Sequence, residues 1–169
     1  MEVKGRVALV TGAASASFQT TIAAFGHIDI VINNAGIMND RFWELEVDIN
    51  LNGVIRGTLL AQRFMGTDKG GQGGIVVNTG SNISINPYVS VPIYSATKAA
   101  IVSLTRAFGW IRIRYKIFFV FSNFFSLFFF SRAEHVAKAL IHILSMGKSG
   151  SIWMVENGEP PREVNFPKY

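Results

Sequence analysis

The chain has 169 residues, of which 49% are hydrophobic and 16% charged, so it is long enough for one folded domain and too apolar to be intrinsically disordered. It contains no cysteine, which excludes disulfides and thiolate chemistry, and its three histidines lack the spacing of a metal site. The net charge of +5 comes from Lys and Arg residues scattered along the chain, a distribution that predicts no nucleic-acid partner.

Short apolar runs alternate with longer segments that suit helices. In chain order, the pattern predicts a strand at 7–10, a helix up to about 26, a strand at 28–32, a helix at 46–65, a strand at 74–78 and a helix at 94–109. Residues 111–114 alternate like a further strand, 134–141 suit a helix, 151–155 suit a last strand, and the tail at 159–162 is predicted to be loose and polar. Strands that alternate with helices predict an α/β fold with a parallel sheet.

The stretch from Ser81 to Lys98 is the first candidate site. Ser81 follows the predicted strand 74–78, and a loop with two prolines leads from it to a helix that carries Tyr94 and Lys98. Because these two residues are four positions apart, the phenol and the ammonium lie on one face of that helix. A hydroxyl, a phenol and a cation gathered near the end of a strand indicate a binding or catalytic site.

Several motifs together resemble the short-chain dehydrogenase/reductase family. They are the Val-Thr-Gly around Gly12, the motif Asn33-Asn34-Ala35-Gly36, Asn50, Ser81, and the pair Tyr94 and Lys98. A Tyr-x-x-x-Lys pair alone is a weak signal, but the ordered set with these spacings is specific. Trp43 and residues 70–78 look most like the NAD-dependent, prostaglandin-oxidising group of this family. The resemblance covers about residues 1–110 with a gap, and resumes weakly near residue 132.

The resemblance implies a Rossmann-like, doubly wound parallel sheet that is incomplete in this chain. The family places two further strands and their helices between the first strand and the one that begins near Ile28. Only about 15 residues separate Gly12 from Ile28 here, whereas a single βαβ unit takes about 30 residues. We therefore expect residues 1–169 to form a single, partial dinucleotide-binding domain that lacks about two strands after the first.

The resemblance assigns catalytic roles to Asn50, Ser81, Tyr94 and Lys98. Tyr94 would be the base that takes the proton of a substrate hydroxyl, and Ser81 would hydrogen-bond the substrate oxygen. Lys98 would stabilise the phenolate, and Asn50 would keep a water in line with Lys98. Lowering a phenol pKa from about 10 to about 7 requires roughly 4 kcal/mol of preferential phenolate stabilisation, which Lys98 and an oxidised nicotinamide are suited to supply.

The implied cofactor is NAD, with NADP not excluded. Gly12 would begin the phosphate loop, and Asn33, Asn34, Ala35 and Gly36 would wall the adenosine side. Tyr94 and Lys98 would contact the nicotinamide ribose. The residue that selects between NAD and NADP is expected about 20 positions past the glycines, in the missing segment. Asp29 begins the next strand and is not interpreted as that residue.

The phosphate loop departs from the family pattern of Gly-x-x-x-Gly-x-Gly. The chain has Ala16 in place of the second glycine and Phe18 in place of the third. A phenylalanine at that position puts a large side chain where the helix is expected to pack closely against strand and pyrophosphate.

Residues 117–131 form an atypical Phe-rich insertion that holds more than half of the chain's 14 phenylalanines. It is interrupted by Ser and Asn and is shorter than the ~20 apolar residues that span a bilayer. Because Phe and Ser codons are pyrimidine-rich, its composition favours translated noncoding sequence. The alternative is a membrane-surface anchor flanked by Arg112, Arg114 and Lys116.

We expect a cytoplasmic NAD-dependent oxidoreductase that acts on a small-molecule secondary alcohol or ketone, and forms a homodimer through helices 46–65 and 94–109. The N-terminal apolar run is too short for a secretory signal core, which agrees with this location. Two alternatives are a catalytically inactive remnant or interaction protein with a defective cofactor loop, and a peripheral membrane protein held by the Phe-rich run.

Overall fold

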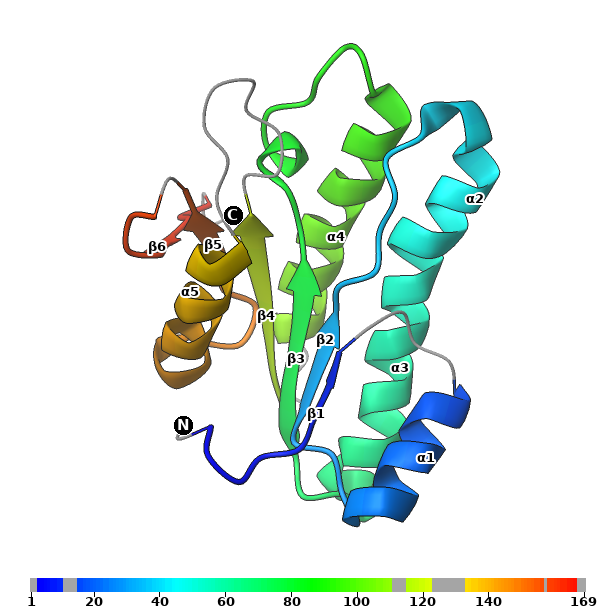
Figure 1. Cartoon of the computed structure of the whole chain (residues 1–169), viewed down its shortest axis with the longest axis vertical. Helices are drawn as coiled ribbons and strands as arrows, with labels where there is room; N and C mark the ends of the chain where they lie inside the picture. Colours follow the sequence, from blue (N-terminus) through cyan, green and yellow to red (C-terminus); the bar gives the residue numbers. More distant parts are fainter. Residues whose placement is uncertain (1–2, 11–14, 111–114, 123–132, 157, 167–169) are drawn as a thin grey trace.

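A computed structural model describes residues 3–10, 15–110, 115–122, 133–156 and 158–166 (Figure 1). Its centre is a six-stranded sheet in which the strands follow one another in chain order. The strands are β1 (Ala8–Val10), β2 (Ile30–Asn33), β3 (Gly74–Thr79), β4 (Tyr115–Ser122), β5 (Ile152–Val155) and β6 (Arg162–Glu163). The first five are parallel, and β6 pairs antiparallel with β5. The predicted Rossmann-like α/β class is confirmed.

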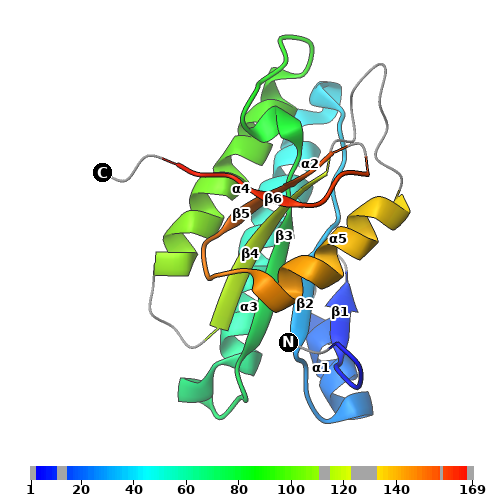
Figure 2. The same ribbon diagram turned by 90° about the vertical axis from the view of Figure 1, so that its left-hand side faces the viewer.

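Helices cover both faces of this sheet. They are α1 (Ser15–Phe25), α2 (Trp43–Val47), α3 (Gly53–Met65), α4 (Pro92–Trp110) and α5 (Ala133–Met146). Figures 1 and 2 show α1, α3 and α4 on one side of the strands and α5 on the other. The side chains of β3 alternate accordingly, because Ile75 and Val77 join the cluster under α5 while Val76 joins the cluster under α1 and α3.

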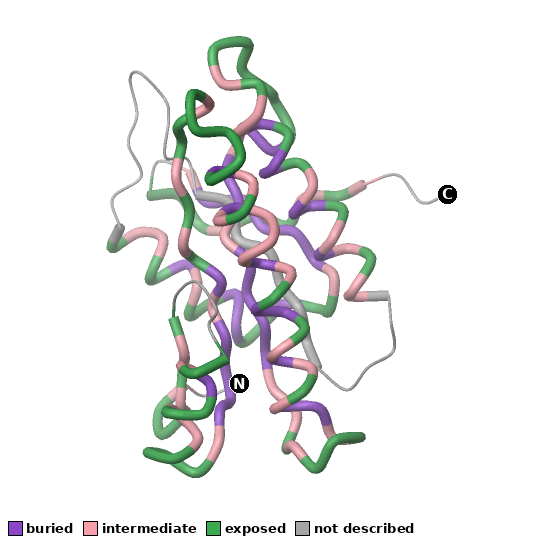
Figure 3. The backbone as a smooth tube through the Cα atoms, turned by 90° about the vertical axis from the view of Figure 1, so that its right-hand side faces the viewer, coloured by how far each residue is buried: buried purple, intermediate pink, exposed green. Residues whose placement is uncertain are grey.

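The sheet is incomplete at the β1 end, as predicted. A single helix, α1, connects β1 to β2, and no further strand is formed between them among the described residues. β1 is therefore the edge of the sheet, and its last residue, Val10, is 52% exposed. The buried positions instead concentrate on β2, β3 and β5 and on the described helices that cover them (Figure 3).

The structure corrects two details of the sequence-based elements, and a third falls on residues that it does not describe. The segment expected to be one helix over 46–65 is divided into α2, a π-helical turn at Asp48–Asn52, and α3. Residues 111–114, expected to be a strand, lie outside the described residues, and the strand next to β3 is β4 instead, which includes the beginning of the Phe-rich segment. The tail that we expected to be loose contributes β6, because Arg162 and Glu163 pair with β5.

Phe18 occupies the core and not the surface of a loop. Its side chain is fully buried on α1 and stacks on Phe64 of α3, with ring centroids 5.7 Å apart. It packs in one cluster with Val31 and Val76 of the sheet. The large side chain that departs from the family pattern is thus what attaches the shortened α1 to α3.

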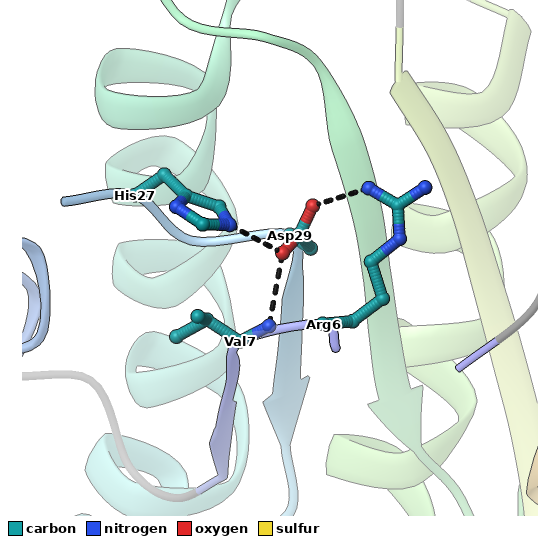
Figure 4. A network of polar contacts seen from close by, with 4 residues as sticks. All are labelled: Arg6, Val7, His27 and Asp29. Carbon is teal, nitrogen blue, oxygen red and sulfur yellow. Dashed lines mark hydrogen bonds and ion pairs between the residues drawn. The ribbon is translucent and has the colours of Figure 1, made fainter. Parts of the chain in front are cut away.

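Asp29 links the beginnings of β1 and β2 (Figure 4). Its carboxylate accepts hydrogen bonds from the Arg6 guanidinium at 2.8 Å and the Val7 backbone N–H at 2.9 Å, and it pairs with His27 at 3.0 Å. Burial tends to raise the pKa of Asp29, but these hydrogen bonds and the charges of His27 and Arg6 together hold that pKa below its usual value. The sequence-based interpretation that Asp29 does not bind ribose agrees with these contacts.

Replacing Asp29 with Asn is expected to lower the free energy of unfolding by about 1–3 kcal/mol, because the Arg6 and Val7 donors lose a charged acceptor. Urea unfolding at neutral pH measures this loss, with the exposed Asp68→Asn as a control that should change stability little. Since the pKa of Asp29 is lowered in the folded chain, its contribution is present above about pH 4 and should vanish as the pH falls below that range. Equal stabilities of wild type and Asp29→Asn at neutral pH would contradict this account.

Candidate functional site

The predicted catalytic residues come together where β3 ends and α4 begins. Ser81 follows β3 and opens a short 3-10 helix at Asn82–Ser84, whereas Tyr94 and Lys98 lie on successive turns of α4. Asn50 lies on the π-helical turn between α2 and α3. Parallel strands of an α/β sheet place their carboxyl ends on one edge, which is where such folds build their sites.

Lys98 is the buried cation of the site. Its side chain reaches back to β3, where Nζ donates a hydrogen bond to the carbonyl of Thr79 at 3.1 Å. The same Nζ lies 5.7 Å from the centroid of the Tyr94 ring. Because the residue is only 4% exposed, burial lowers the pKa of Lys98 to about 8, although the nearby Glu46 carboxyl opposes this shift.

Tyr94 is half-buried, and its phenol interacts with Ser81. Burial raises the pKa of Tyr94, the hydrogen bond with Ser81 lowers it, and the Glu46 carboxyl raises it, with a net increase. We expected the ammonium of Lys98 to lower this pKa. In the protein alone the Lys98 nitrogen lies 5.7 Å from the ring centroid, and Lys98 is not among the groups that shift this pKa.

Ser81 is held by its own local turn. It is buried, its backbone N–H donates to the hydroxyl of Ser84 at 3.2 Å, and its hydroxyl donates to the Asn82 side chain at 3.2 Å. The contact with Ser84 belongs to a capping box at the start of the short helix, in which the side chains of Ser81 and Ser84 each face the backbone N–H of the other. The turn therefore fixes the direction of the Ser81 hydroxyl next to Tyr94.

Asn50 is fully buried and anchors the segment that follows β2. Its side-chain oxygen accepts from the Ile37 N–H at 2.8 Å, and its side-chain nitrogen donates to the Ile37 carbonyl at 2.7 Å. A weaker contact of 3.4 Å joins it to the Thr97 hydroxyl on α4. Asn50 is part of a π-helical turn, a rare element that is often found at functional sites.

The motif Asn33-Asn34-Ala35-Gly36 connects β2 to this site. Asn33 donates to the Asn78 side chain at 2.8 Å within the sheet, and Asn34 accepts from the Thr79 hydroxyl at 3.2 Å. A Cβ on Gly36 would lie 3.2 Å from the Asn50 side-chain oxygen and 3.4 Å from the Lys98 nitrogen. Glycine thus lets the backbone pass close to both polar groups. The predicted Gly12 lies outside the described residues.

Two acidic residues of the site were missed by the sequence-based interpretation. Asp40 accepts hydrogen bonds from the backbone N–H groups of Ile93 at 2.8 Å and Tyr94 at 3.2 Å, which are free donors in the first turn of α4. Glu46 is fully buried and faces the same helix. The spacing of Glu46 and Asn50, four residues apart on one helical face, was the available signal.

Two other kinds of site are not found in the described part of the chain. No group of three or more His, Asp or Glu side chains there could hold a metal ion. None of the helices described is long and apolar enough to cross a membrane.

Curated proteins similar to this chain are NAD-linked dehydrogenases. The 15-hydroxyprostaglandin dehydrogenase [NAD(+)] of Homo sapiens is 41% identical over 91 residues, which are 54% of this chain and 34% of the human protein. The protein of the same name from Rattus norvegicus is 40% identical over 91 residues, with the same coverage of both chains. The matched region thus spans about a third of the length of these relatives.

Solved structures of short-chain dehydrogenases share the fold. One from Mycobacterium smegmatis matches with a TM-score of 0.73 and 24% identity, covering 84% of this chain and 64% of that chain. The NADH-dependent reductase A1-R', solved in complex with NAD, matches with a TM-score of 0.70 and 22% identity, covering 85% and 68%. Both structures extend well beyond the matched part, which agrees with the missing strands next to β1.

The sequence profile of the short chain dehydrogenase family matches residues 6–117, which include β1, β2, β3, α4 and every catalytic residue predicted above. More than half of the chain is covered by this match, and the strand order and helix layers agree with it. The protein therefore belongs to the short-chain dehydrogenase family.

Proposed function

We propose that this site transfers a hydride between a small secondary alcohol or ketone and NAD, with NADP not excluded. The observation that carries the proposal is the buried Lys98, whose Nζ lies between the Thr79 carbonyl and the Tyr94 ring, beside Gly36. A buried ammonium with a single protein acceptor among its described contacts has donors left for a ligand. The relatives named for 15-hydroxyprostaglandin and NAD support the same reaction class.

Each residue of the site has a separate role in the oxidation of an alcohol. The Ser81 hydroxyl orients the substrate oxygen, and the Tyr94 oxygen accepts the hydroxyl proton as the carbon–hydrogen bond breaks. Lys98 stabilises the phenolate by its charge, and Asn50 holds the segment around Gly36 against Lys98. When bound beside Lys98, NAD would supply the hydride acceptor. In the reverse direction Tyr94 returns the proton to the ketone oxygen.

The residues fit one half of the cofactor better than the other. Lys98 suits the nicotinamide ribose, and Gly36, which we expected on the adenosine side, lies next to the Lys98 nitrogen and leaves room there because it has no Cβ. On the adenosine side, β1 is the edge of the sheet, so the strands that would flank an adenine in a complete doubly wound sheet are absent from the described chain. We therefore expect weaker NAD binding than in a complete family member.

The incomplete β1 edge of the sheet also supports a second candidate function. A chain that keeps the catalytic residues with half of a cofactor site would be a catalytically inactive remnant or an interaction protein. The membrane alternative has less support, because the described part of the Phe-rich run, Ile117–Ser122, belongs to β4 inside the sheet.

We also propose a cytoplasmic homodimer through α3 and α4, and a single partial domain over residues 1–169 that includes the atypical segment 117–131.

Titration with NAD and NADH, followed by nucleotide fluorescence, separates the enzyme from the remnant. We expect saturable binding in the wild type and at least about tenfold weaker binding in Lys98→Ala, because a desolvated charged donor is lost. The exposed Lys69→Ala is the matched control and should bind like the wild type. Absence of binding at millimolar nucleotide would overturn the proposed function for this chain.

Removing the Tyr94 hydroxyl is expected to lower kcat/KM for a secondary alcohol by about 100-fold or more, because the general base is lost. Tyr94→Phe is compared with Tyr88→Phe, a substitution in the exposed loop before α4 that should leave kcat/KM nearly unchanged. Steady-state rates of NADH formation at saturating NAD measure both variants. A Tyr94→Phe variant as active as the wild type would remove Tyr94 from the reaction.

The burial of Lys98 predicts how stability changes with pH. The folded chain holds this pKa at about 8, while the unfolded chain keeps the ordinary value of 10.5. Between these two pH values the unfolded chain binds more protons, so the Lys98 contribution to the free energy of unfolding rises with pH. Urea unfolding from about pH 7 to 10 should show this rise in the wild type and a flatter profile in Lys98→Met. Parallel profiles would show that Lys98 ionises as if it were exposed.

A further inference from the structure

Glu46 is a carboxyl buried without a full set of partners. The residue is 0% exposed, and one of its oxygens, Oε1, accepts from the Asn39 backbone N–H at 2.9 Å. The other oxygen, Oε2, is buried and has no hydrogen-bond partner in the described structure. A buried carboxylate oxygen without a donor is costly, whereas a protonated carboxyl needs only an acceptor.

That acceptor is next to it. Asp40 directly follows Asn39, whose backbone N–H binds Glu46, and a hydrogen bond between the two carboxyls is one cause of the raised pKa of Glu46. Two ionised carboxylates only accept, so a hydrogen bond between them requires a proton on one of them. Both carboxyl oxygens of Asp40 already accept hydrogen bonds at the start of α4, one from the N–H of Ile93 and one from the N–H of Tyr94. The proton therefore belongs on Glu46.

An ion pair with Lys98 is the obvious other role for a buried glutamate, and the geometry argues against it. Among the described residues, no ion pair within 4 Å includes Lys98 or Glu46. The Lys98 nitrogen instead donates to the Thr79 carbonyl on β3. Glu46 is near enough to act on Lys98 by its charge but is not its counterion.

We propose that Glu46 is a positioning residue that keeps its proton at neutral pH and donates it in a hydrogen bond to Asp40. This bond holds the Asp40 carboxylate against the turn of α4 that carries Tyr94. It also keeps a second negative charge away from the phenol. The protonation is a property of the folded chain alone, whereas its effect on catalysis rests on the proposed function.

The charged and titratable groups that face Glu46 agree with this assignment. They are Asp40 from the 3-10 helix at Asp40–Phe42, and Tyr94 and Lys98 from α4. Burial raises the pKa of Glu46, and the neighbouring Asp40 raises the same pKa further. The Asn39 N–H and the charge of Lys98 lower it, but the net change is an increase. If Glu46 loses its proton, its charge raises the pKa of Tyr94, so that a smaller fraction of Tyr94 is the phenolate that can accept a proton at neutral pH.

The pH dependence of stability tests the proton on Glu46 without any cofactor. A carboxyl whose pKa is raised on folding binds more protons in the folded than in the unfolded chain, so stability falls as the pH rises from the ordinary value of 4.5 to the raised value. We expect this fall in the wild type and a flatter profile in Glu46→Gln, whose amide can still donate to Asp40. Glu44→Gln, on the exposed side of α2, is the control and should keep the wild-type slope.

Titration of the phenol tests the electrostatic effect. The phenolate absorbance of Tyr94 is obtained as the difference between each protein and the same protein carrying Tyr94→Phe. In Glu46→Gln the Tyr94 phenol should ionise about half a pH unit or more below the wild type, because Glu46 has lost its proton at the alkaline pH where the phenol ionises, and the variant lacks that charge. Unchanged phenol ionisation together with an unchanged stability slope would overturn the proposal.

A measurement on the wild type covers the case in which Glu46→Gln does not fold. Carboxyl 13C resonances of labelled glutamates, followed from about pH 3 to 9, should show one glutamate that stays protonated well above the usual range. If every glutamate ionises near its ordinary value, the proposal fails. None of these readouts needs NAD, so they separate a failure of this proposal from a failure of the proposed function. In an active enzyme, Glu46→Gln should also shift the acid limb of kcat/KM to lower pH.

Discussion

The pair of hydrogen bonds between the Asn50 amide and the Ile37 backbone is the constraint on which the site depends. Both polar atoms of one buried side chain are satisfied by a single residue of the chain that leaves β2. This contact fixes Gly36 under the Lys98 nitrogen, and so relates the end of the sheet to α4. Without it, Gly36 would not be held next to the Lys98 nitrogen, whose hydrogen bond among the described residues is to Thr79.

Burial then decides the electrostatics. Lys98 and Glu46 are both almost completely buried. Burial lowers the pKa of Lys98 and raises the pKa of Glu46, so it favours the neutral form of each side chain. The Asp40 carboxyl accepts hydrogen bonds from two N–H groups at the start of α4. The Asp40 carboxyl therefore lies at the N-terminus of α4, and the Lys98 side chain starts one turn after Tyr94 on the same helix.

The sequence predicted the elements that have a periodic apolar pattern and the site residues that belong to a recognisable motif. Apolar runs located β1, β2, β3 and β5, and the ordered set Asn50, Ser81, Tyr94 and Lys98 located the site. It could not predict contacts that exist only after folding. Asp40 caps a helix more than 50 residues away, and nothing near it in the chain indicates this. The place of β4 in the sheet was also hidden, because a Phe-rich run has no period that distinguishes a strand from an insertion.

The consecutive strand order has a consequence for how the chain can fold. In a complete doubly wound sheet the first strand lies in the middle, and one of its two neighbours is a strand that comes much later in the chain. Here each strand pairs with the one made just before it, from β1 to β6. Pairings between strands that are close in sequence have a smaller loop-closure cost and form faster. The loss of two strands has therefore turned a sheet that assembles from its centre into one that can grow from its first edge during synthesis.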